Sequence, residues 1–344
     1  MFSKIFLSKS KLLSNVNYVK SMAGKPICVM VKANAYGHGA KEVVSILNGH
    51  VDYFGVACQK EGEEARRHTD GHIVVFGKCE DYRLCMEKNL SFSLFSFEDA
   101  ENITKTVKKY NLMPRFHMCL NSGMNRYGFK EKDDILKTID FLDKSNIELE
   151  GFYTHFSSLT TDYDYTQRQK EKFYEMKKLI PKDWKTVKHA GGGKSVYMNI
   201  DADMYRTGIE CYGYGNENVS PILRVESEVV DKQNVKKGEH IGYLCGYTAS
   251  KDMTVATIPL GYADGLPRKL SNKLEVTING QKAKSTGNIC MDAFMVDVTN
   301  VDCKRGDKVS VITNASEIAP LIESTEYEVL TNLTKLRGER IIEE

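Results

Sequence analysis

The sequence predicts an α/β protein with an N-terminal (β/α)8 barrel of the TIM type and a mostly β C-terminal domain. Short apolar runs alternate with charged, helix-compatible stretches over the first two thirds of the chain, and from about Pro221 strands follow one another without helices. The length of 344 residues suits about two domains. An open doubly wound sheet is the alternative for the first part, but such sheets usually have fewer strands.

The barrel prediction rests on short runs that are rich in apolar and β-branched residues. These runs are Ile27–Val31, Tyr53–Ala57, Ile73–Phe76, Phe92–Phe95, Phe116–Leu120, Gly151–Thr154, Thr186–Ala190 and Ile209–Gly213. The stretches between them that suit helices include Glu61–His68, Phe97–Tyr110, Glu131–Lys144 and Gln167–Leu179. Buried strands that alternate with helices are typical of a parallel barrel.

The last third of the chain predicts strands only. They are Ile222–Val230, Thr254–Pro259, Leu274–Ile278, Lys282–Ser285, Phe294–Thr299 and Val309–Thr313. Asn279-Gly280 stands between two of these strands, and it predicts a type I′ hairpin because both turn positions need a positive φ. We therefore expect a barrel domain over residues 1–223 and a β-rich domain over residues 224–344.

The composition excludes several classes of function. The 48 basic and 46 acidic side chains nearly balance at a net charge of +2, and no basic tract suggests nucleic-acid binding. The nine cysteines are scattered without a C-x-x-C pair, which favours a reducing compartment over a zinc cluster. No apolar run reaches the roughly 18–20 residues of a membrane span, and the N-terminus lacks a signal peptide. We expect a cytoplasmic protein that binds no nucleic acid, membrane or metal.

A lysine follows the first predicted strand of the barrel. Lys32 comes directly after Ile27–Val31, and the chemistry of parallel barrels lies at the carboxyl ends of their strands. At that place its side chain would be partly buried, which disfavours the charged ammonium and lowers the pKa. A neutral amine can act as a nucleophile or as a base.

The segment that begins at this lysine is distinctive. Lys32–Gly39 (KANAYGHG) closely resembles the pyridoxal-phosphate signature of the alanine racemase family, and further segments match that family in order along nearly the whole chain. The resemblance implies an isomerase that interconverts L- and D-alanine, in the biosynthesis of D-alanine as a peptidoglycan precursor. It also implies that Lys32 forms the internal aldimine with pyridoxal 5′-phosphate and that Tyr36 contacts the cofactor phosphate.

Two arginines are assigned by the same resemblance. Arg126 lies in GMNRYGF, where the family's arginine touches the ring oxygen of the cofactor and orients the substrate carboxylate. Arg206 lies in YRTGI, where the family's arginine donates to the pyridine nitrogen. Because arginine does not release its proton, the ring nitrogen would stay unprotonated and the ring would be a weaker electron sink. Such a ring favours return of a proton to Cα over transamination.

Five more residues are expected around the cofactor. The resemblance implies that the backbone amides of Gly208 and Ile209 bind the cofactor phosphate. It also implies that His155 and His189 line the cofactor and hold the arginine, and that the C-terminal Tyr327 reaches the phosphate. Exposed amides where a loop enters a helix are suited to anions.

The second catalytic base is expected in the C-terminal domain. The segment YLCGYTA resembles the one that carries this base, so Tyr247 and Lys32 would exchange the Cα proton on opposite faces of the aldimine. A phenol titrates near ~10, so Tyr247 needs positive charge such as Arg126 nearby. The segment ICMD resembles one whose methionine, here Met291, meets the substrate carboxylate from the partner subunit. The resemblance thus implies a homodimer with shared sites.

The chain departs from the family pattern in three places. Cys119 occupies the position of a lysine that is often carbamylated and steadies the arginine, and Asn121 replaces an aspartate. A metal site of His117 and Cys119 is another interpretation, although two ligands are weak support. The family's phosphate-binding serine falls on Gly193, whose amide can still bind an anion, and Ser195 offers a hydroxyl nearby.

Other functions stay open at this point. A serine or broad-specificity amino-acid racemase would share the same frame. Fold-related amino-acid decarboxylases use a glycine-rich phosphate loop, which Gly191–Gly193 could form, but they place a carboxylate at the pyridine nitrogen where this chain has Arg206. A single-barrel cofactor carrier would lack residues 224–344.

Overall fold

The computed structural model describes residues 3–192, 194–198 and 200–344. The chain divides into two compact units, which we describe separately. The barrel unit consists of Val16–Ala33 and Val43–Cys211, and the β unit consists of Asn34–Glu42, Tyr212–Glu344 and the N-terminal residues through Asn15.

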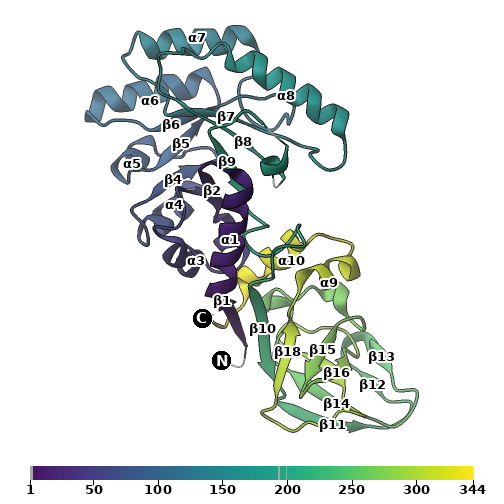
Figure 1. Ribbon diagram of the computed structural model, residues 1–344. Coiled ribbons are helices and arrows are strands. Elements are labelled where there is room, and N and C mark those ends of the chain that lie inside the picture. The colour runs from purple at the N-terminus through teal and green to yellow at the C-terminus, as the bar shows by residue number, and fades with distance from the viewer. Residues whose placement is uncertain (1–2, 193, 199) are drawn as a thin grey trace. The chain divides into compact units, whose positions relative to one another are not determined.

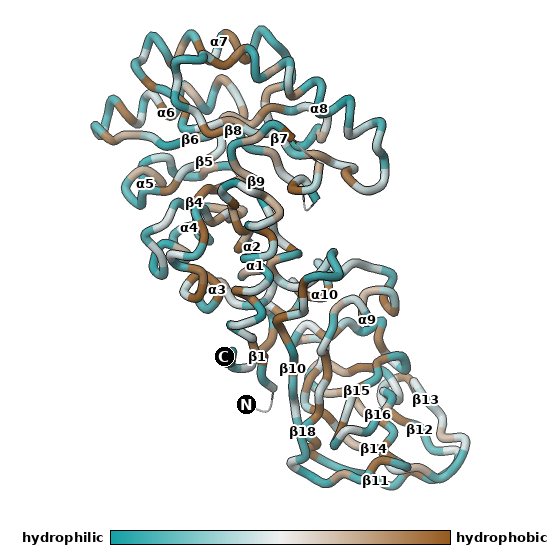
Figure 2. The backbone as a smooth tube through the Cα atoms, in the orientation of Figure 1, coloured by the Kyte–Doolittle hydropathy of each residue, from teal (hydrophilic) through white to brown (hydrophobic). Residues whose placement is uncertain are grey.

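The barrel unit contains the predicted parallel barrel, closed by strands β2 to β9 in sequence order (Figure 1). The strands are β2 (Ile27–Met30), β3 (Tyr53–Val56), β4 (His72–Val75), β5 (Ser91–Leu94), β6 (Phe116–Cys119), β7 (Gly151–His155), β8 (Val187–Gly191) and β9 (Met204–Thr207). Most of their residues are buried, and Figure 2 shows hydrophobic residues along the strands beside the largely hydrophilic trace of α8. The fold class is therefore confirmed.

Helices connect the strands, as the sequence predicts. Their bounds are α1 (Lys9–Ala23), α2 (Lys32–Tyr36), α3 (Ala40–Leu47), α4 (Gln59–Arg66), α5 (Tyr82–Glu87), α6 (Phe97–Tyr110), α7 (Lys132–Asp143) and α8 (Tyr163–Lys177). Helix α6 shows why the bounds can be predicted. The Ser96 side chain accepts a hydrogen bond from the Asp99 amide at its start, and Asn111 adopts a left-handed conformation at its end.

The eighth predicted strand is wrong. Residues Ile209–Gly213 form turns, and the last barrel strand is β9, which pairs with β2 and β8. The cause is that β9 carries Arg206, whose charged side chain is 5% exposed inside the barrel and hides the strand from an apolar-run search. The structure thereby places Arg206 on a barrel strand and not in a loop before one.

The β unit is built on a sheet of order β16-β15-β18-β10-β1-β19. Its strands are β1 (Lys4–Ser8), β10 (Leu223–Glu228), β15 (Glu275–Ile278), β16 (Gln281–Lys284), β18 (Lys308–Ile312) and β19 (Glu339–Glu343). The predicted hairpin is confirmed, since Ile278 pairs with Gln281 while Asn279 and Gly280 have φ angles of 50° and 78°. The strand β1, from the opposite end of the chain, pairs with both β10 and β19.

Smaller elements complete the β unit. A second sheet has the order β11-β14-β17, and β12 pairs with β13. These strands and the helices are β11 (Asp231–Val235), β12 (His240–Ile241), β13 (Tyr247–Thr248), β14 (Met253–Ile258), β17 (Phe294–Asp297), α9 (Ala315–Ile318) and α10 (Glu326–Asn332). The short 3-10 turns are η1 (Ser195–Tyr197, in the barrel unit), η2 (Tyr243–Cys245), η3 (Tyr262–Asp264), η4 (Arg268–Leu270), η5 (Ala319–Ile322) and η6 (Leu333–Lys335). No helix within the described residues is long and apolar enough to cross a membrane.

Candidate active site

Lys32 follows β2 at the carboxyl end of the barrel and is half-buried. Burial, and then the positive charges of Arg126 and Arg206, lower the pKa of Lys32, while Glu61 opposes this shift. The amine is thus closer to its neutral, reactive form at a given pH than an exposed lysine. This outcome agrees with the expectation for a lysine at this place in a barrel.

Glu61, which the sequence analysis missed, holds the backbone around Lys32. Its Oε1 accepts a hydrogen bond from the Ala33 amide at 2.7 Å, and its Oε2 accepts one from the Ala57 amide at 2.8 Å. One carboxylate on α4 therefore ties the segment after β2 to the segment after β3. Because it bonds two backbone amides, its negative charge stays near Lys32.

The segment after Lys32 is a left-handed turn. The φ angles of Ala33, Asn34, Ala35 and Tyr36 are 51°, 52°, 52° and 51°, although none of these residues is glycine. A left-handed conformation costs an ordinary L-residue roughly 1–2 kcal/mol, so this turn stores strain beside the reactive lysine. The Asn34 side chain supports it by accepting a hydrogen bond from the Ala40 amide at 2.7 Å.

Arg206 lies buried in β9 with its guanidinium committed to acceptors inside the barrel. Nη1 donates to His189 Nδ1 at 2.7 Å, and Nη2 donates to the Thr154 carbonyl at 2.7 Å and to His155 Nδ1 at 3.4 Å. Gly191 leaves the necessary room, since a Cβ there would lie 2.0 Å from Nη2. The structure thus brings together Arg206, His155 and His189, and it assigns Gly191 a packing role that the sequence did not indicate.

The two histidines around Arg206 have lowered pKa values, which keep their rings neutral beside the cation. Burial and then Arg206 lower the pKa of His155 to about 3, and the same two causes hold the pKa of His189 well below its usual range. Both rings are therefore neutral and can accept hydrogen bonds from the guanidinium. The Arg206 guanidinium also lies over the rings of Phe76 and Tyr153, 5.0 Å and 4.8 Å from their centroids.

Arg126 is exposed, and within the described residues it forms no ion pair; its guanidinium lies 5.8 Å from the ring centroid of its neighbour Tyr127. Cys119 does not supply an anion, because burial raises the pKa of its thiol to about 11. Gly128 packs against this thiol, since a Cβ at Gly128 would lie 2.7 Å from Sγ. The charge of Arg126 is thus available to a ligand.

The interpretation of His117 and Cys119 as a metal site fails on geometry. His117 Nδ1 lies 2.8 Å from His189 Nε2, and His117 Nε2 lies 3.2 Å from Glu150 Oε2, so both ring nitrogens are engaged in hydrogen bonds. The Cys119 thiol is directed to the Tyr127 carbonyl at 3.7 Å. Among the described residues, no group of three or more His, Cys, Asp or Glu side chains could hold a metal ion.

Two segments of the barrel unit were expected at the phosphate, one after β9 and one around Ser195. Gly208 and Ile209 follow β9 in a turn closed by a hydrogen bond from the Cys211 amide to the Gly208 carbonyl at 3.0 Å, so the expected helix start is wrong. Ser195 is fully buried in η1, and its hydroxyl has no partner among the described residues. Gly193 lies outside the described residues.

The aromatic residues of the β unit that were assigned to the phosphate lie together. The ring centroids of Tyr36 and Tyr327 are 5.6 Å apart, and those of Tyr36 and Tyr212 are 5.2 Å apart. Gly37 makes this packing possible, because its φ is 83° and a Cβ would lie 1.9 Å from the Leu330 carbonyl oxygen of α10. The structure therefore unites two expected residues that are far apart in the sequence.

Tyr247 and Met291 lie on neighbouring loops of the β unit. Tyr247 is half-buried in β13, and Asn288, on the Met291 loop, donates to the Tyr243 carbonyl at 2.8 Å. Met291 is 52% exposed, and its carbonyl accepts a hydrogen bond from the Ala263 amide at 3.0 Å. The Asn288 contact joins the loops that carry the two residues, and the Ala263 contact joins the Met291 loop to η3.

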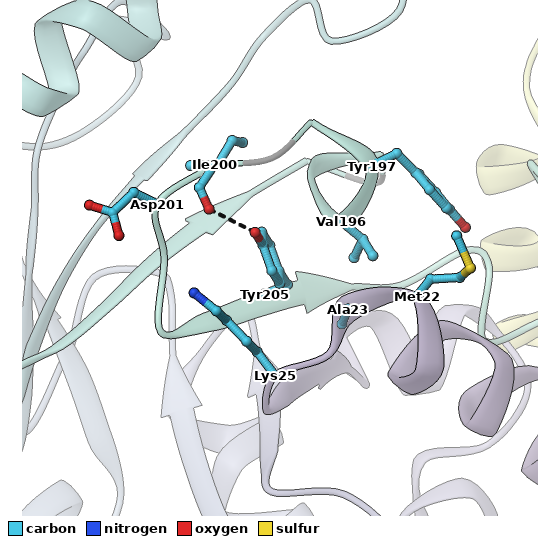
Figure 3. A pocket seen from close by; sticks show the side chains of 8 residues that line it. All are labelled: Met22, Ala23, Lys25, Val196, Tyr197, Ile200, Asp201 and Tyr205. Atoms are coloured by element: carbon cyan, nitrogen blue, oxygen red, sulfur yellow. Dashed lines mark hydrogen bonds between the residues drawn. The ribbon is translucent and has the colours of Figure 1, made fainter.

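A pocket on the barrel unit is lined by none of the residues assigned to the site (Figure 3). It is lined by Met22, Ala23, Lys25, Val196, Tyr197, Ile200, Asp201 and Tyr205, and the Tyr205 hydroxyl donates to the Ile200 carbonyl at 2.7 Å. Tyr205 and Arg206 are neighbours in a strand, so their side chains point to opposite faces of the barrel wall. The pocket is thus outside the barrel, and the candidate site is at its mouth.

The barrel mouth fits an anionic cofactor that carries an aldehyde. Besides burial, the charges of Arg126 and Arg206 lower the pKa of Lys32, and burial together with the charge of Arg126 lowers the pKa of Arg206. The buried hydroxyl of Ser195 lacks a partner among the described residues and can still donate to an anion. A half-buried amine can bond to an aldehyde carbon. The donor set therefore suits pyridoxal phosphate.

The fold and this site define a class of two-domain protein that presents a half-buried lysine at the carboxyl end of a barrel strand. Models of the alanine racemase N-terminal and C-terminal domains match residues 7–216 and 222–342. The chain belongs to the alanine racemase family.

Individual members show how close the similarity is. The alanine racemase of Halothermothrix orenii is 32% identical over 359 residues, covering 95% of this chain and 93% of the relative. The solved alanine racemase of Clostridium difficile 630 has a TM-score of 0.93 at 30% identity, covering 100% of this chain and 96% of its own. The structure from Bartonella henselae, described with covalently bound pyridoxal phosphate, shares the fold with a TM-score of 0.88 at 24% identity over 100% of both chains.

A first prediction concerns the charge balance at Lys32. Replacing Glu61 by glutamine removes the anion that opposes the shift, so Glu61→Gln should lower the pKa of Lys32 further. The pH dependence of reductive methylation at each lysine of the cofactor-free protein, followed by mass spectrometry, measures this. Glu63→Gln on the same helix is the control and should leave Lys32 unchanged. Titration of Lys32 together with the exposed lysines would contradict the account.

Proposed function

We propose that this protein is a pyridoxal-phosphate-dependent racemase that interconverts L- and D-alanine. The observation that carries the proposal is the half-buried Lys32, with its lowered pKa, at the mouth of a barrel that also presents Arg126 and Arg206. The match to the alanine racemase family over both domains gives the substrate. The free cysteines support work in a reducing compartment such as the cytoplasm.

Pyridoxal phosphate, when bound, supplies an aldehyde and a conjugated ring that withdraws electrons from the substrate Cα. Lys32 would hold the aldehyde carbon through Nζ. The hydroxyls of Tyr36 and Tyr327 and the amides of Gly208 and Ile209 would hold the phosphate. Residues 1–223 would thus provide most of the groups that bind the cofactor, and residues 224–344 would add Tyr327 and complete the site.

Arg206 would donate to the pyridine nitrogen. Nη1 donates to His189, and Nη2 donates to His155 and the Thr154 carbonyl, so among the described residues Nε–H and the second hydrogen of Nη1 are left for a ligand. Burial lowers the pKa of Arg206, but a guanidinium does not give up its proton in proteins, so it can only donate. A ring nitrogen facing such a donor has to stay unprotonated. This supports a racemase over a decarboxylase, which needs a carboxylate at that position.

Two groups would move the Cα proton, one on each face of the substrate. Lys32 is one, because its lowered pKa brings the neutral amine closer to working pH. Tyr247 is the other, and a phenol becomes a base near neutrality only beside positive charge. The guanidinium of Arg126 is the charge we assign to this task, together with orienting the substrate carboxylate. His155 and His189 would hold Arg206.

We further propose a homodimer in which Tyr247 and Met291 enter the site of the partner subunit. The loops that carry them expose apolar side chains, with Tyr243 at 71%, Leu244 at 84% and Met291 at 52% exposure. Large apolar side chains exposed together on linked loops favour an interface. A two-fold dimer would bury them twice and form two equivalent sites.

Racemisation itself is the direct test of the proposed function. Protein loaded with pyridoxal phosphate should bring L-alanine and D-alanine to the same zero circular-dichroism signal. Lys32→Ala should lower the rate by at least about a hundredfold, the usual contribution of a general base. Lys41→Ala, which changes an exposed lysine nearby in the sequence, should keep the wild-type rate. The proposal is wrong if neither enantiomer is inverted or if borohydride fixes the cofactor on another lysine.

The shared site can be tested by mixing two inactive variants. Subunits of Lys32→Ala and Tyr247→Phe should recover activity after exchange, because each hybrid dimer contains one intact site and one doubly defective site. Statistical mixing makes about half of the dimers hybrid, so roughly a quarter of all sites should be active. Native mass spectrometry confirms the exchange, and each variant alone is the control. Verified exchange without recovered activity would show that Tyr247 acts within its own chain.

A further inference from the structure

A buried chain of hydrogen bonds runs from Arg206 across the interior of the barrel. It passes from Arg206 to His189 at 2.7 Å, from His189 to His117 at 2.8 Å, and from His117 to Glu150 at 3.2 Å. Both histidines are fully buried. The members come from β9, its neighbour β8, and β6, which β7 separates from β8 in the barrel. Glu150 stands directly before β7, at the amino end of that strand.

The direction of every hydrogen bond in this chain is determined at one end. Arg206 can only donate, so His189 Nδ1 must accept and its Nε2 must carry the hydrogen. His189 Nε2–H then donates to His117 Nδ1, which leaves His117 Nε2–H to donate to Glu150. Only this pair of tautomers satisfies all three bonds, because any other places two donors or two acceptors face to face.

At the other end of this hydrogen-bond chain, the Glu150 carboxylate is an acceptor, as the direction of the hydrogen bonds requires. Burial alone would raise the pKa of Glu150, but hydrogen bonds from His117, Arg115 and Ser91 hold it well below its usual value. Glu150 Oε1 accepts from Arg115 Nε at 3.0 Å, and Oε2 accepts from Ser91 Oγ. The carboxylate is therefore ionised near neutral pH and accepts a hydrogen bond from His117.

The barrel wall is shaped to keep the chain in place. A Cβ at Gly151, the first residue of β7, would lie 2.4 Å from His117 Nδ1, so the imidazole packs directly on the glycine backbone. The His189 ring is held between neighbours, stacking on Tyr153 with centroids 5.0 Å apart.

We propose that His117 and Glu150 are positioning residues for the reaction: they fix the tautomer of His189 and thereby hold Arg206 where it donates to the ring nitrogen of the cofactor. The role of Arg206 rests on the proposed function, whereas the tautomers do not. If His189 carried its hydrogen on Nδ1, that N–H would face the N–H of Arg206 Nη1. No hydrogen bond could form between two donors, and the guanidinium would have to move. The carboxylate of Glu150 prevents this from a distance, through two imidazole rings.

The test is imidazole ¹⁵N NMR on the cofactor-free protein with labelled histidine, of which the chain has eight. His117 and His189 should both show the Nε2–H tautomer. In Glu150→Gln the His189 resonances should move, although residue 150 does not touch His189. Glu64→Gln is a matched control, because Glu64 accepts from His68 Nε2 at the same 3.2 Å but leads to no arginine of the site. An Nδ1–H or charged His189, or His189 resonances unchanged in Glu150→Gln, would overturn the inference.

Kinetics of the loaded enzyme separate positioning from mere stability. Glu150→Gln should lower kcat about tenfold with little change in KM, as expected when a hydrogen bond that orients a charged catalytic group is weakened. Glu150→Asp, which keeps the anion, should restore most of the rate. If kcat is unchanged while the resonances move, the positioning role is wrong. If the wild type does not racemise alanine, the proposed function fails while the tautomers stand.

A milder variant covers the case in which Glu150→Gln does not fold. Ser91→Ala removes one donor to Glu150 and leaves the carboxylate and Arg115 in place. In the same NMR experiment, Ser91→Ala should shift the His117 and His189 resonances, but by less than Glu150→Gln does. Unchanged resonances of both histidines in this variant would contradict transmission along the chain.

Discussion

One buried cation, the guanidinium of Arg206, determines which groups surround it in the barrel interior and how they are oriented. A group that can only donate hydrogen bonds requires acceptors on every side, and the barrel supplies the Thr154 carbonyl and two neutral histidines. It also requires room, which Gly191 provides by lacking a side chain. The low pKa values of His155 and His189 follow from the same burial and the same charge. The site is thus an electrostatic arrangement built around one arginine.

The carboxyl end of the barrel combines this arginine with Lys32, which a strained left-handed turn follows. Burial and neighbouring cations favour the neutral amine of Lys32, and Glu61 limits that effect while it ties down the backbone. The left-handed turn after Lys32 is costly for residues with side chains, and it persists because hydrogen bonds and packing determine it. A ligand with negative charge and an aldehyde would relieve the repulsion among the cations. This is the physical reason why we expect tight binding of pyridoxal phosphate.

Much of this could be predicted from the sequence, because local pattern determined it. Lys32 follows a run of apolar residues, and Asn279-Gly280 carries its own turn preference, so both were placed correctly. The strand β9 was missed because a buried arginine interrupts its apolar pattern. Glu150 was missed for a related reason: an acidic residue before a strand looks like a solvated one until its partners from β6 and elsewhere are known. The pairing of β1 with β10 and β19 depends on contacts between distant parts of the chain.

The central claim is that Arg206 faces the ring nitrogen of the cofactor as a donor and keeps that nitrogen unprotonated. The most direct measurement is the ¹⁵N chemical shift of ring-labelled pyridoxal phosphate bound to the protein, recorded near neutral pH. The account predicts the shift of a neutral pyridine that accepts a hydrogen bond, and it predicts a change toward pyridinium in Arg206→Glu. A pyridinium shift in the wild-type protein would contradict the account, because a proton on that nitrogen leaves Arg206 nothing to donate to.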